Sequence, residues 1–101
     1  MKNVAILGST GSVGKSTLDV IRHNREKFCV DLLTANKNYE LMIEQYNEFS
    51  PRYVYLEDSS AQKAFLDKVE KLQAGTLLLT CESDLNSVLS AQTTEIVVAA
   101  M

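Results

Sequence analysis

The sequence has no long apolar run, little cysteine and a single proline among its 101 residues. The apolar run from Val4 to Leu7 ends at a glycine and is too short for a signal peptide. No stretch approaches the roughly 20 apolar residues that a membrane-spanning helix needs. Cys29 and Cys81 have no paired spacing, which favours a reducing compartment over a disulfide framework or a zinc site. We therefore expect an intracellular protein with no membrane segment.

An excess of charge of one sign is also missing. Ten basic and thirteen acidic side chains give a formal net charge of -3 at pH 7. Nucleic-acid-binding domains usually carry a strongly basic face, so no nucleic-acid partner is expected. Apolar residues make up 46% of the chain, which at this length suffices for one modest hydrophobic core. Because no repeat or proline-rich linker divides the sequence, residues 1–101 are expected to form one domain.

Apolar residues alternate between short runs and helical spacing along the chain. Short apolar runs predict strands at residues 4–7, 28–34, 53–56, 77–79 and 96–98. The four helices predicted between them have these inner faces: Val13, Thr17, Leu18 and Ile21; Tyr39, Met42, Ile43, Tyr46 and Phe49; Ala61, Ala64, Phe65, Val69 and Leu72; Leu85, Val88 and Leu89. Strand–helix–strand units require parallel pairing and right-handed crossovers. We expect an α/β fold, a doubly wound, mainly parallel five-stranded sheet with helices on both faces.

Polar residues, glycine and the one proline mark the expected helix ends. Asn38 is suited to cap the second helix, which is expected to end at Ser50-Pro51. Ser59 and Gln62 have the spacing of a capping box at the start of the third helix, and Gly75 is expected to close that helix.

Three of the four glycines lie in the segment LGSTGSVGKST, residues 7–17. Its end, Gly14-Lys15-Ser16, is typical of a P-loop that binds a nucleoside triphosphate. A P-loop also requires a glycine four intervening residues before Gly14, where this sequence has Ser9. Gly8 stands one residue too early, so the loop has the wrong length to wrap a phosphate. The P-loop interpretation is therefore disfavoured.

The same glycines fit a variant of the dinucleotide-binding fingerprint, with the spacing G-x-x-G-x-x-G. Gly8 and Gly11 would let the backbone approach a pyrophosphate closely, and Gly14 would let the helix pack tightly on the strand. Four backbone amides are then expected to point toward the pyrophosphate, those of Thr10, Gly11, Ser12 and Val13. Because the motif follows a buried strand and opens an amphipathic helix, it predicts a Rossmann-like coenzyme domain.

The end of the second predicted strand indicates which cofactor is bound. NAD sites usually place an acidic residue there to bind the ribose 2′-hydroxyl, whereas this segment reads Thr34-Ala35-Asn36-Lys37-Asn38. Asp31 lies within the strand and is expected at an edge or solvent position. Lys37, between two asparagines, offers a cation and hydrogen-bond donors for a 2′-phosphate. The sequence therefore favours NADP over NAD.

Several segments together resemble a known family. ILGSTGSVGKSTLDVIRHN, ANKN, EFSPRYV and EIVVAA are similar to the N-terminal NADPH-binding domain of the 1-deoxy-D-xylulose 5-phosphate reductoisomerase family. The resemblance implies a cytoplasmic enzyme of non-mevalonate isoprenoid biosynthesis that isomerises and reduces 1-deoxy-D-xylulose 5-phosphate to 2-C-methyl-D-erythritol 4-phosphate. It also implies NADPH as cofactor and, in the full-length enzyme, Mg²⁺ or Mn²⁺ and a homodimer. Carried over residue by residue, the cofactor contacts fall on Thr10, Gly11, Ser12, Val13, Asn36, Lys37 and Asn38.

Members of that family are several times longer than this chain. The resemblance therefore implies that their metal ligands, substrate contacts and mobile active-site loop lie beyond these residues. We expect an isolated coenzyme domain with no catalytic or metal-binding residues and no turnover of its own. Family members often have glycine at the place of Asn36; asparagine tolerates left-handed backbone angles, so a backbone contact is expected there. His23 and Lys15 are expected to be surface residues of the first helix.

Two other classes share parts of this pattern. The coenzyme domain of a semialdehyde or acyl-phosphate dehydrogenase has a similar glycine loop, but such an enzyme needs a catalytic cysteine. Cys29 begins a strand and Cys81 has no histidine partner, so neither fits that role. A receiver-like signalling module shares the alternation of five strands, but it needs acidic residues after the first strand, where Gly8-Ser9-Thr10 stands. Asp58 alone does not supply them.

Overall fold

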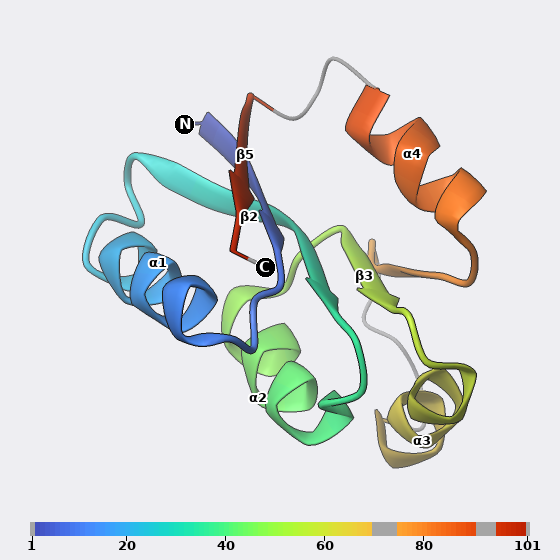
Figure 1. Ribbon diagram of the computed structural model, residues 1–101. Helices are drawn as coiled ribbons and strands as arrows, with labels where there is room; N and C mark the ends of the chain where they lie inside the picture. The colour runs from blue at the N-terminus through green and yellow to red at the C-terminus, as the bar shows by residue number, and fades with distance from the viewer. Residues whose placement is uncertain (1, 70–74, 91–94, 101) are drawn as a thin grey trace.

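Five strands and four helices alternate along the part of the chain that the computed structural model describes, residues 2–69, 75–90 and 95–100 (Figure 1). The strands are β1 (Lys2–Leu7), β2 (Phe28–Ala35), β3 (Tyr53–Leu56), β4 (Leu77–Leu79) and β5 (Ile96–Ala99). The helices are α1 (Ser12–Arg22), α2 (Tyr39–Phe49), α3 (Ser59–Val69) and α4 (Glu82–Ser90). The predicted type and order of these elements are confirmed.

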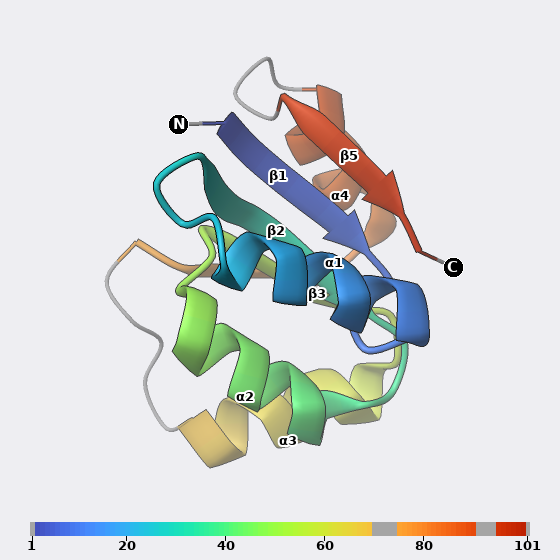
Figure 2. The same cartoon turned by 90° about the vertical axis from the view of Figure 1, so that its left-hand side faces the viewer.

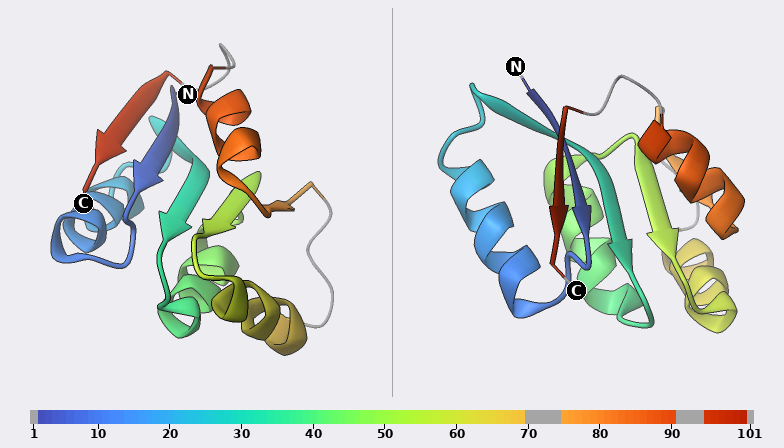
Figure 3. Two further views of the ribbon diagram at one scale, coloured as in Figure 1. Left: turned by 45° about the vertical axis from the view of Figure 1, so that its right-hand side comes forward. Right: turned by 45° about the horizontal axis from the view of Figure 1, so that its top comes forward.

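The described strands form one sheet in the order β4-β3-β2-β1-β5, and each of its pairings is parallel. Helices α1, α2 and α3 pack on one face of the sheet, and α4 packs on the other (Figure 2 and Figure 3). The predicted doubly wound α/β sheet with helices on both faces is therefore confirmed. None of the helices in the described ranges is long and apolar enough to cross a membrane.

The strand order reverses at β1. Strands β2, β3 and β4 follow on one side of β1, whereas β5 pairs on its other side after the chain has crossed to the opposite face through α4. Figure 2 shows β1 and β5 side by side, with the start of α1 near the carboxyl end of β1. In doubly wound sheets, ligands bind outside the carboxyl ends of the strands at such a reversal. The topology thus directs attention to the residues that follow β1 and β5.

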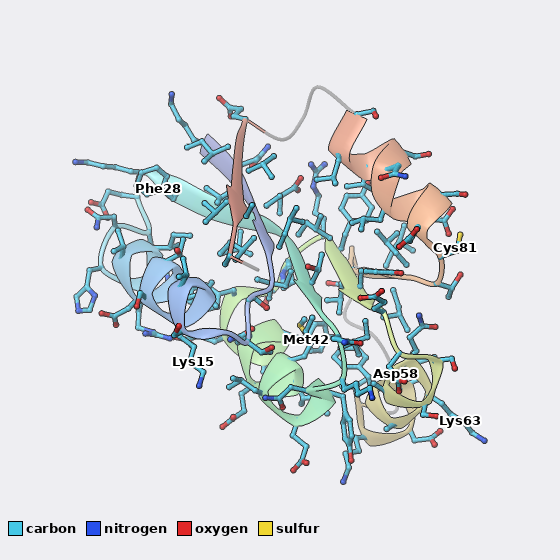
Figure 4. All side chains as sticks on the ribbon, in the orientation of Figure 1. Lys15, Phe28, Met42, Asp58, Lys63 and Cys81 are labelled. Atoms are coloured by element: carbon cyan, nitrogen blue, oxygen red, sulfur yellow. The ribbon has the colours of Figure 1, made fainter. Side chains whose placement is uncertain are left out.

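Most of the core lies between the sheet and the layer of α1, α2 and α3. Its fully buried members include Ile6, Leu18, Leu33, Met42, Tyr46, Val54, Leu56 and Phe65. The rings of Tyr46 and Phe65 meet edge to face at 5.5 Å and join α2 to α3. Figure 4 shows Met42 within this layer. A smaller cluster under α4 contains Ala5, Leu32, Tyr55 and Leu79.

Helix α1 departs from its predicted inner face at one position. Gly14, Leu18 and Ile21 are buried, whereas Val13 is 54% exposed. The residues at i, i+4 and i+7 form the stripe that faces the sheet, and Val13 lies to one side of it. The prediction of Val13 as a core residue is therefore wrong, and Val13 stands at the surface next to the glycine segment.

An irregularity in β2 buries Asp31. The register between β1 and β2 shifts between Val4 and Ala5, so that Asp31 is the extra residue on β2. Asp31 is 1% exposed, and its carboxylate accepts a hydrogen bond from Nε of Arg52. The predicted edge or solvent position of Asp31 is wrong. Arg52 reaches this carboxylate from the start of β3, a contact that the local sequence around Asp31 does not reveal.

Side chains cap α2 and α3. Oδ1 of Asn38 accepts a backbone hydrogen bond of 3.2 Å from the first turn of α2, which confirms Asn38 as its N-cap. At α3, Oδ2 of Asp58 accepts a hydrogen bond of 2.9 Å from the N–H of Ala61. The predicted capping box of Ser59 and Gln62 is therefore wrong. A carboxylate is favoured at this place because it faces the positive end of the helix dipole.

At the other helix ends that the structure describes, the residues predicted to end a helix are in place. Helix α2 ends at Phe49; its C-cap Ser50 has a left-handed φ of 46°, and Pro51 comes next. Gly75 has a φ of 89°, a conformation that favours glycine. The described part of α3 ends at Val69. The predicted place of Leu72 on its inner face lies outside the described residues.

Candidate functional site

The segment after β1 forms a tight turn that β2 holds in place. Gly8 has a left-handed φ of 87°, which favours glycine. Its N–H donates to Oγ1 of Thr34 at 2.9 Å and to the carbonyl of Thr34 at 3.1 Å. The N–H of Gly11 donates to the carbonyl of Gly8 at 3.2 Å and closes the turn. Among the four amides expected to face a pyrophosphate, that of Gly11 is thus already engaged.

The N-terminus of α1 follows this turn without a cap from its own side chains. Gly11 is the N-cap residue, and the first turn of the helix contains no acidic residue. The first N–H groups of a helix have no acceptor within it, and the helix dipole makes this end partially positive. Ser12 and Val13 are exposed in this turn. The arrangement is suited to an anion such as a phosphate.

The glycines of this segment serve different purposes. A Cβ on Gly14 would lie 2.4 Å from the carbonyl oxygen of Gly8 and 2.6 Å from Cα of Ser9, so the close packing of α1 on the turn requires glycine. A Cβ on Gly11 would lie 3.5 Å from the same oxygen of Gly8, an ordinary contact. The fold itself therefore does not require glycine at position 11.

A cavity of about 420 Å³ lies beside the turn. Its lining comes from the ends of β1, β2 and β3, from α4 and from the residue after β5: Leu7, Gly8, Thr10, Gly11, Thr34, Ala35, Asn36, Tyr55, Glu57, Glu82, Leu85 and Ala100. The cavity joins the glycine turn to the end of β2, as the dinucleotide interpretation requires. Burial, and next the carboxylates of Glu82 and Glu57, raise the pKa of Tyr55. The Tyr55 hydroxyl is therefore neutral near pH 7 and able to donate a hydrogen bond.

A more open groove of about 520 Å³ runs between α1 and α2, away from this cavity. Three of its charged side chains pair with one another, since Arg22 binds Asp19 at 3.0 Å and also binds Glu48. The hydrogen bond from Arg22 lowers the pKa of Glu48. Lys15 lines this groove rather than the cavity and points into solvent (Figure 4), as predicted. The larger groove is therefore a solvated ion-pair surface and the smaller cavity is the candidate site.

The three polar residues after β2 lie in different environments. Asn36 lines the cavity, and its carbonyl accepts a hydrogen bond of 3.1 Å from the N–H of Asp58. Lys37 is exposed, with its carbonyl bound to the N–H of Tyr39 at 2.8 Å. The side-chain oxygen of Asn38 is occupied by the cap of α2. The side chain of Lys37 is thus the cation at this end of β2, while Asn38 is committed in part to the fold.

Three residues that shape the site were not predicted from the sequence. Ser9, Thr34 and Gln45 are polar and buried, and they hydrogen-bond to one another around the turn. Ser9 occupies the place of a glycine in the fingerprint, and its hydroxyl donates to the carbonyl of Thr34 at 3.3 Å. A signal for Gln45 was present, because a polar residue between Met42 and Tyr46 falls on the predicted inner face of α2.

Other candidate residues lie outside the cavity. The side chain of His23 is 72% exposed at the end of α1, as predicted. Cys29 and Cys81 are free and exposed, and Figure 4 shows Cys81 at the start of α4. Within the described ranges, no three His, Cys, Asp or Glu side chains are grouped closely enough to hold a metal ion. We assign no metal ligand to these residues.

The chain matches one family of known proteins over almost its full length. Residues 4–101 match the family model for 1-deoxy-D-xylulose 5-phosphate reductoisomerase. The reductoisomerases of Haemophilus ducreyi and Saccharophagus degradans are each 40% identical to it over 101 residues. These alignments cover 100% of this chain but 26% of either relative, so the chain spans about a quarter of their length.

Solved structures give the same result. A DOX-P reductoisomerase in complex with NADPH, fosmidomycin and magnesium is 28% identical, with a TM-score of 0.88 over 100% of this chain and 24% of that one. The reductoisomerase of Zymomonas mobilis in complex with NADPH is 26% identical, with a TM-score of 0.74 over 85% of this chain and 22% of that one. The chain belongs to the 1-deoxy-D-xylulose 5-phosphate reductoisomerase family.

Proposed function

We propose that residues 1–101 form the NADPH-binding domain of a 1-deoxy-D-xylulose 5-phosphate reductoisomerase. The observation that carries the proposal is the cavity at the strand reversal, bordered by the glycine turn at the uncapped N-terminus of α1. Two solved relatives are in complex with NADPH, which agrees with this choice of ligand. The whole enzyme would isomerise and reduce 1-deoxy-D-xylulose 5-phosphate to 2-C-methyl-D-erythritol 4-phosphate, with bound NADPH as the hydride source.

Each part of the cofactor has a suitable place. The pyrophosphate would lie against the N–H groups of Thr10, Ser12 and Val13, at the positive end of α1. Gly8 and Gly14 shape this turn, and Gly11 leaves room in front of it. At the end of β2, the backbone of Asn36 would border the adenosine ribose, and Lys37 would bind its 2′-phosphate. Asn38 would contribute the part of its amide that the helix cap leaves free.

The remaining parts of the reaction are proposed for the whole enzyme only. A solved relative is in complex with magnesium, but the described residues supply no ligand set for a metal and we derive no step through one. The cytoplasmic location and the full-length homodimer are proposed on the family resemblance alone. They do not affect the cofactor site described above.

Isothermal titration calorimetry on the 101-residue chain tests the proposal. We expect NADPH to bind, NADH to bind more weakly because it lacks the 2′-phosphate, and ATP with Mg²⁺ not to compete with NADPH. ATP affinity above that for NADPH would restore the P-loop interpretation. Equal affinity for NADPH and NADH would contradict the role of the segment after β2.

A further inference from the structure

We infer that Gln45, on α2, is a positioning residue for the cofactor. Its side chain fixes the peptide plane between Ser9 and Thr10, so that the N–H of Thr10 faces the cavity before any ligand arrives. The inference rests on the proposed function, because it assumes that a dinucleotide pyrophosphate binds at this turn. It goes beyond that proposal in assigning a role to a side chain that does not itself touch the ligand.

The contact that carries the inference joins two segments far apart in the sequence. Nε2 of Gln45 donates a hydrogen bond of 2.9 Å to the carbonyl oxygen of Ser9. Gln45 is 6% exposed and Ser9 is 0% exposed, so water does not compete for this bond. The described residues contain no cis peptide bond. In a trans peptide, the C=O and the following N–H point in opposite directions. Since the Ser9 carbonyl points toward α2, the Thr10 N–H points away from α2, and Thr10 lines the cavity.

Ser9 is also held from two other elements. Its N–H donates to the carbonyl of Thr34 at 2.8 Å, and its hydroxyl donates to the same oxygen at 3.3 Å. On the other side, Cα of Ser9 lies only 2.6 Å from the place that a Cβ on Gly14 would take. The backbone of Ser9 therefore packs directly against α1 and cannot move toward it. These contacts fix the N–H and side chain of Ser9. The hydrogen bond from Gln45 acts on its carbonyl and so on the orientation of the next amide. A binding amide held in place in advance reduces the ordering cost of binding.

Gln45 fulfils this role at a cost to its own hydrogen bonding. Its Oε1 is buried and has no hydrogen-bond partner among the described residues. Turning the amide over would place Oε1 against the Ser9 carbonyl, where two acceptors would repel each other. A buried acceptor without a partner lowers stability. A glutamine used only to fill space is therefore a poor choice here, whereas a glutamine used as a donor to Ser9 accounts for the arrangement.

The test compares two ligands and two matched variants of the 101-residue chain. Gln45→Met keeps the length of the side chain and removes the donor, and Asn47→Met makes the same kind of change at an exposed position of α2. NADPH contains the pyrophosphate, whereas adenosine 2′-monophosphate does not. We expect Gln45→Met to weaken NADPH binding about tenfold, which equals about 1.4 kcal/mol. Its affinity for adenosine 2′-monophosphate, and both affinities of Asn47→Met, should stay at the wild-type values.

The outcomes separate this inference from the proposed function. A wild-type chain that does not bind NADPH overturns both. A wild-type chain that binds NADPH, with Gln45→Met binding it equally well, overturns the inference and leaves the function standing. Equal losses for both ligands indicate general loosening of the domain and also overturn it. Should Gln45→Met fail to fold, the wild-type chain still gives a decision by NMR. NADPH must shift the Thr10 amide resonance, and an unmoved Thr10 resonance in the presence of bound NADPH contradicts the inference.

Discussion

Lys37 can be changed without disturbing the fold, because its side chain is exposed and only its backbone carbonyl is used, by the N–H of Tyr39. A charge-assisted hydrogen bond to a phosphate contributes roughly 1.5–3 kcal/mol. We expect Lys37→Ala to weaken NADPH binding by about one to two decades and to leave NADH binding almost unchanged. The measurement is the ratio of the two dissociation constants, and the loss should shrink at high salt.

Lys63→Ala is the control for Lys37→Ala, because Lys63 is an exposed lysine on α3 (Figure 4). It removes the same charge from α3, outside the segment of residues 36–38. An unmoved NADPH-to-NADH ratio in Lys37→Ala, or an equal shift in Lys63→Ala, would show that Lys37 does not bind the 2′-phosphate.

Gly11 offers a second test at the scale of one residue. Its backbone has a φ of -79° and a ψ of 173°, which any residue can adopt, and a Cβ would make only ordinary contacts within the chain. Gly11→Val should therefore keep the fold while its methyl groups occupy the space of the pyrophosphate. We expect an unchanged circular dichroism spectrum and no NADPH binding detectable by calorimetry. Wild-type affinity in a folded Gly11→Val chain would rule out this turn as the dinucleotide site.

The packing of α1 on the turn leads to the opposite expectation for Gly14. Alanine in a helix normally gains about 1 kcal/mol over glycine, but here its Cβ would meet the Gly8 carbonyl at 2.4 Å. Because that neighbour is backbone, the overpacking should cost about 3 kcal/mol, the upper end of the usual range, and outweigh the gain. Urea denaturation should show Gly14→Ala to be less stable than wild type, with Ser16→Ala, at an exposed position of α1, close to wild type. A more stable Gly14→Ala would mean that the helix is free to shift.

The ion pair between β2 and the start of β3 is a second packing element open to test. Asp31 is almost fully buried, and the Arg52 side chain beside it is 47% exposed. Removing one partner of a buried pair costs about 3–5 kcal/mol, but solvent screens this half-exposed arginine. Arg52→Gln should therefore lower the free energy of unfolding by about 1–2 kcal/mol in urea denaturation. Lys63→Gln should change the free energy of unfolding little. Equal effects of the two variants would show that the ion pair does not stabilise the fold.

The elements and the glycine turn could be predicted from the sequence because their signals are local. Short apolar runs, helical spacing and the three glycines of residues 8–14 each lie within one element or one junction. The exposure of Val13 and the cap by Asp58 were local errors, but the other features that were missed depend on contacts between distant elements. The buried carboxylate of Asp31 is paired with Arg52, 21 residues later. Gln45 belongs to the site because Ser9, 36 residues away, folds against it. Spacing along one element carries no information about such partners.

For the molecule as a whole, the cavity is built from several elements, so its ligand should stabilise all of them together. A ligand that binds only the folded state, present at 100 times its dissociation constant, adds about 2.7 kcal/mol. For a domain of this size, that shift corresponds to a melting temperature higher by about 10 °C or more. We expect NADPH to produce this rise in thermal denaturation of the chain. Its absence at saturating NADPH would contradict binding to the folded domain.

We expect the pairing of β1 with β5 to be the step that completes the proposed cofactor site during folding. Asn3 on β1 and Glu95 before β5 are hydrogen-bonded although 92 residues separate them. Such a closure is entropically costly and slow compared with the joining of neighbouring elements. We expect strands β1 to β4 to assemble through successive crossovers and β5 to dock against β1 afterwards. The glycine turn is translated first, but the wall of the cavity is complete only when Ala100, after β5, is in place. On this order of assembly, the proposed cofactor site would be completed in one late step, after the rest of the domain has formed.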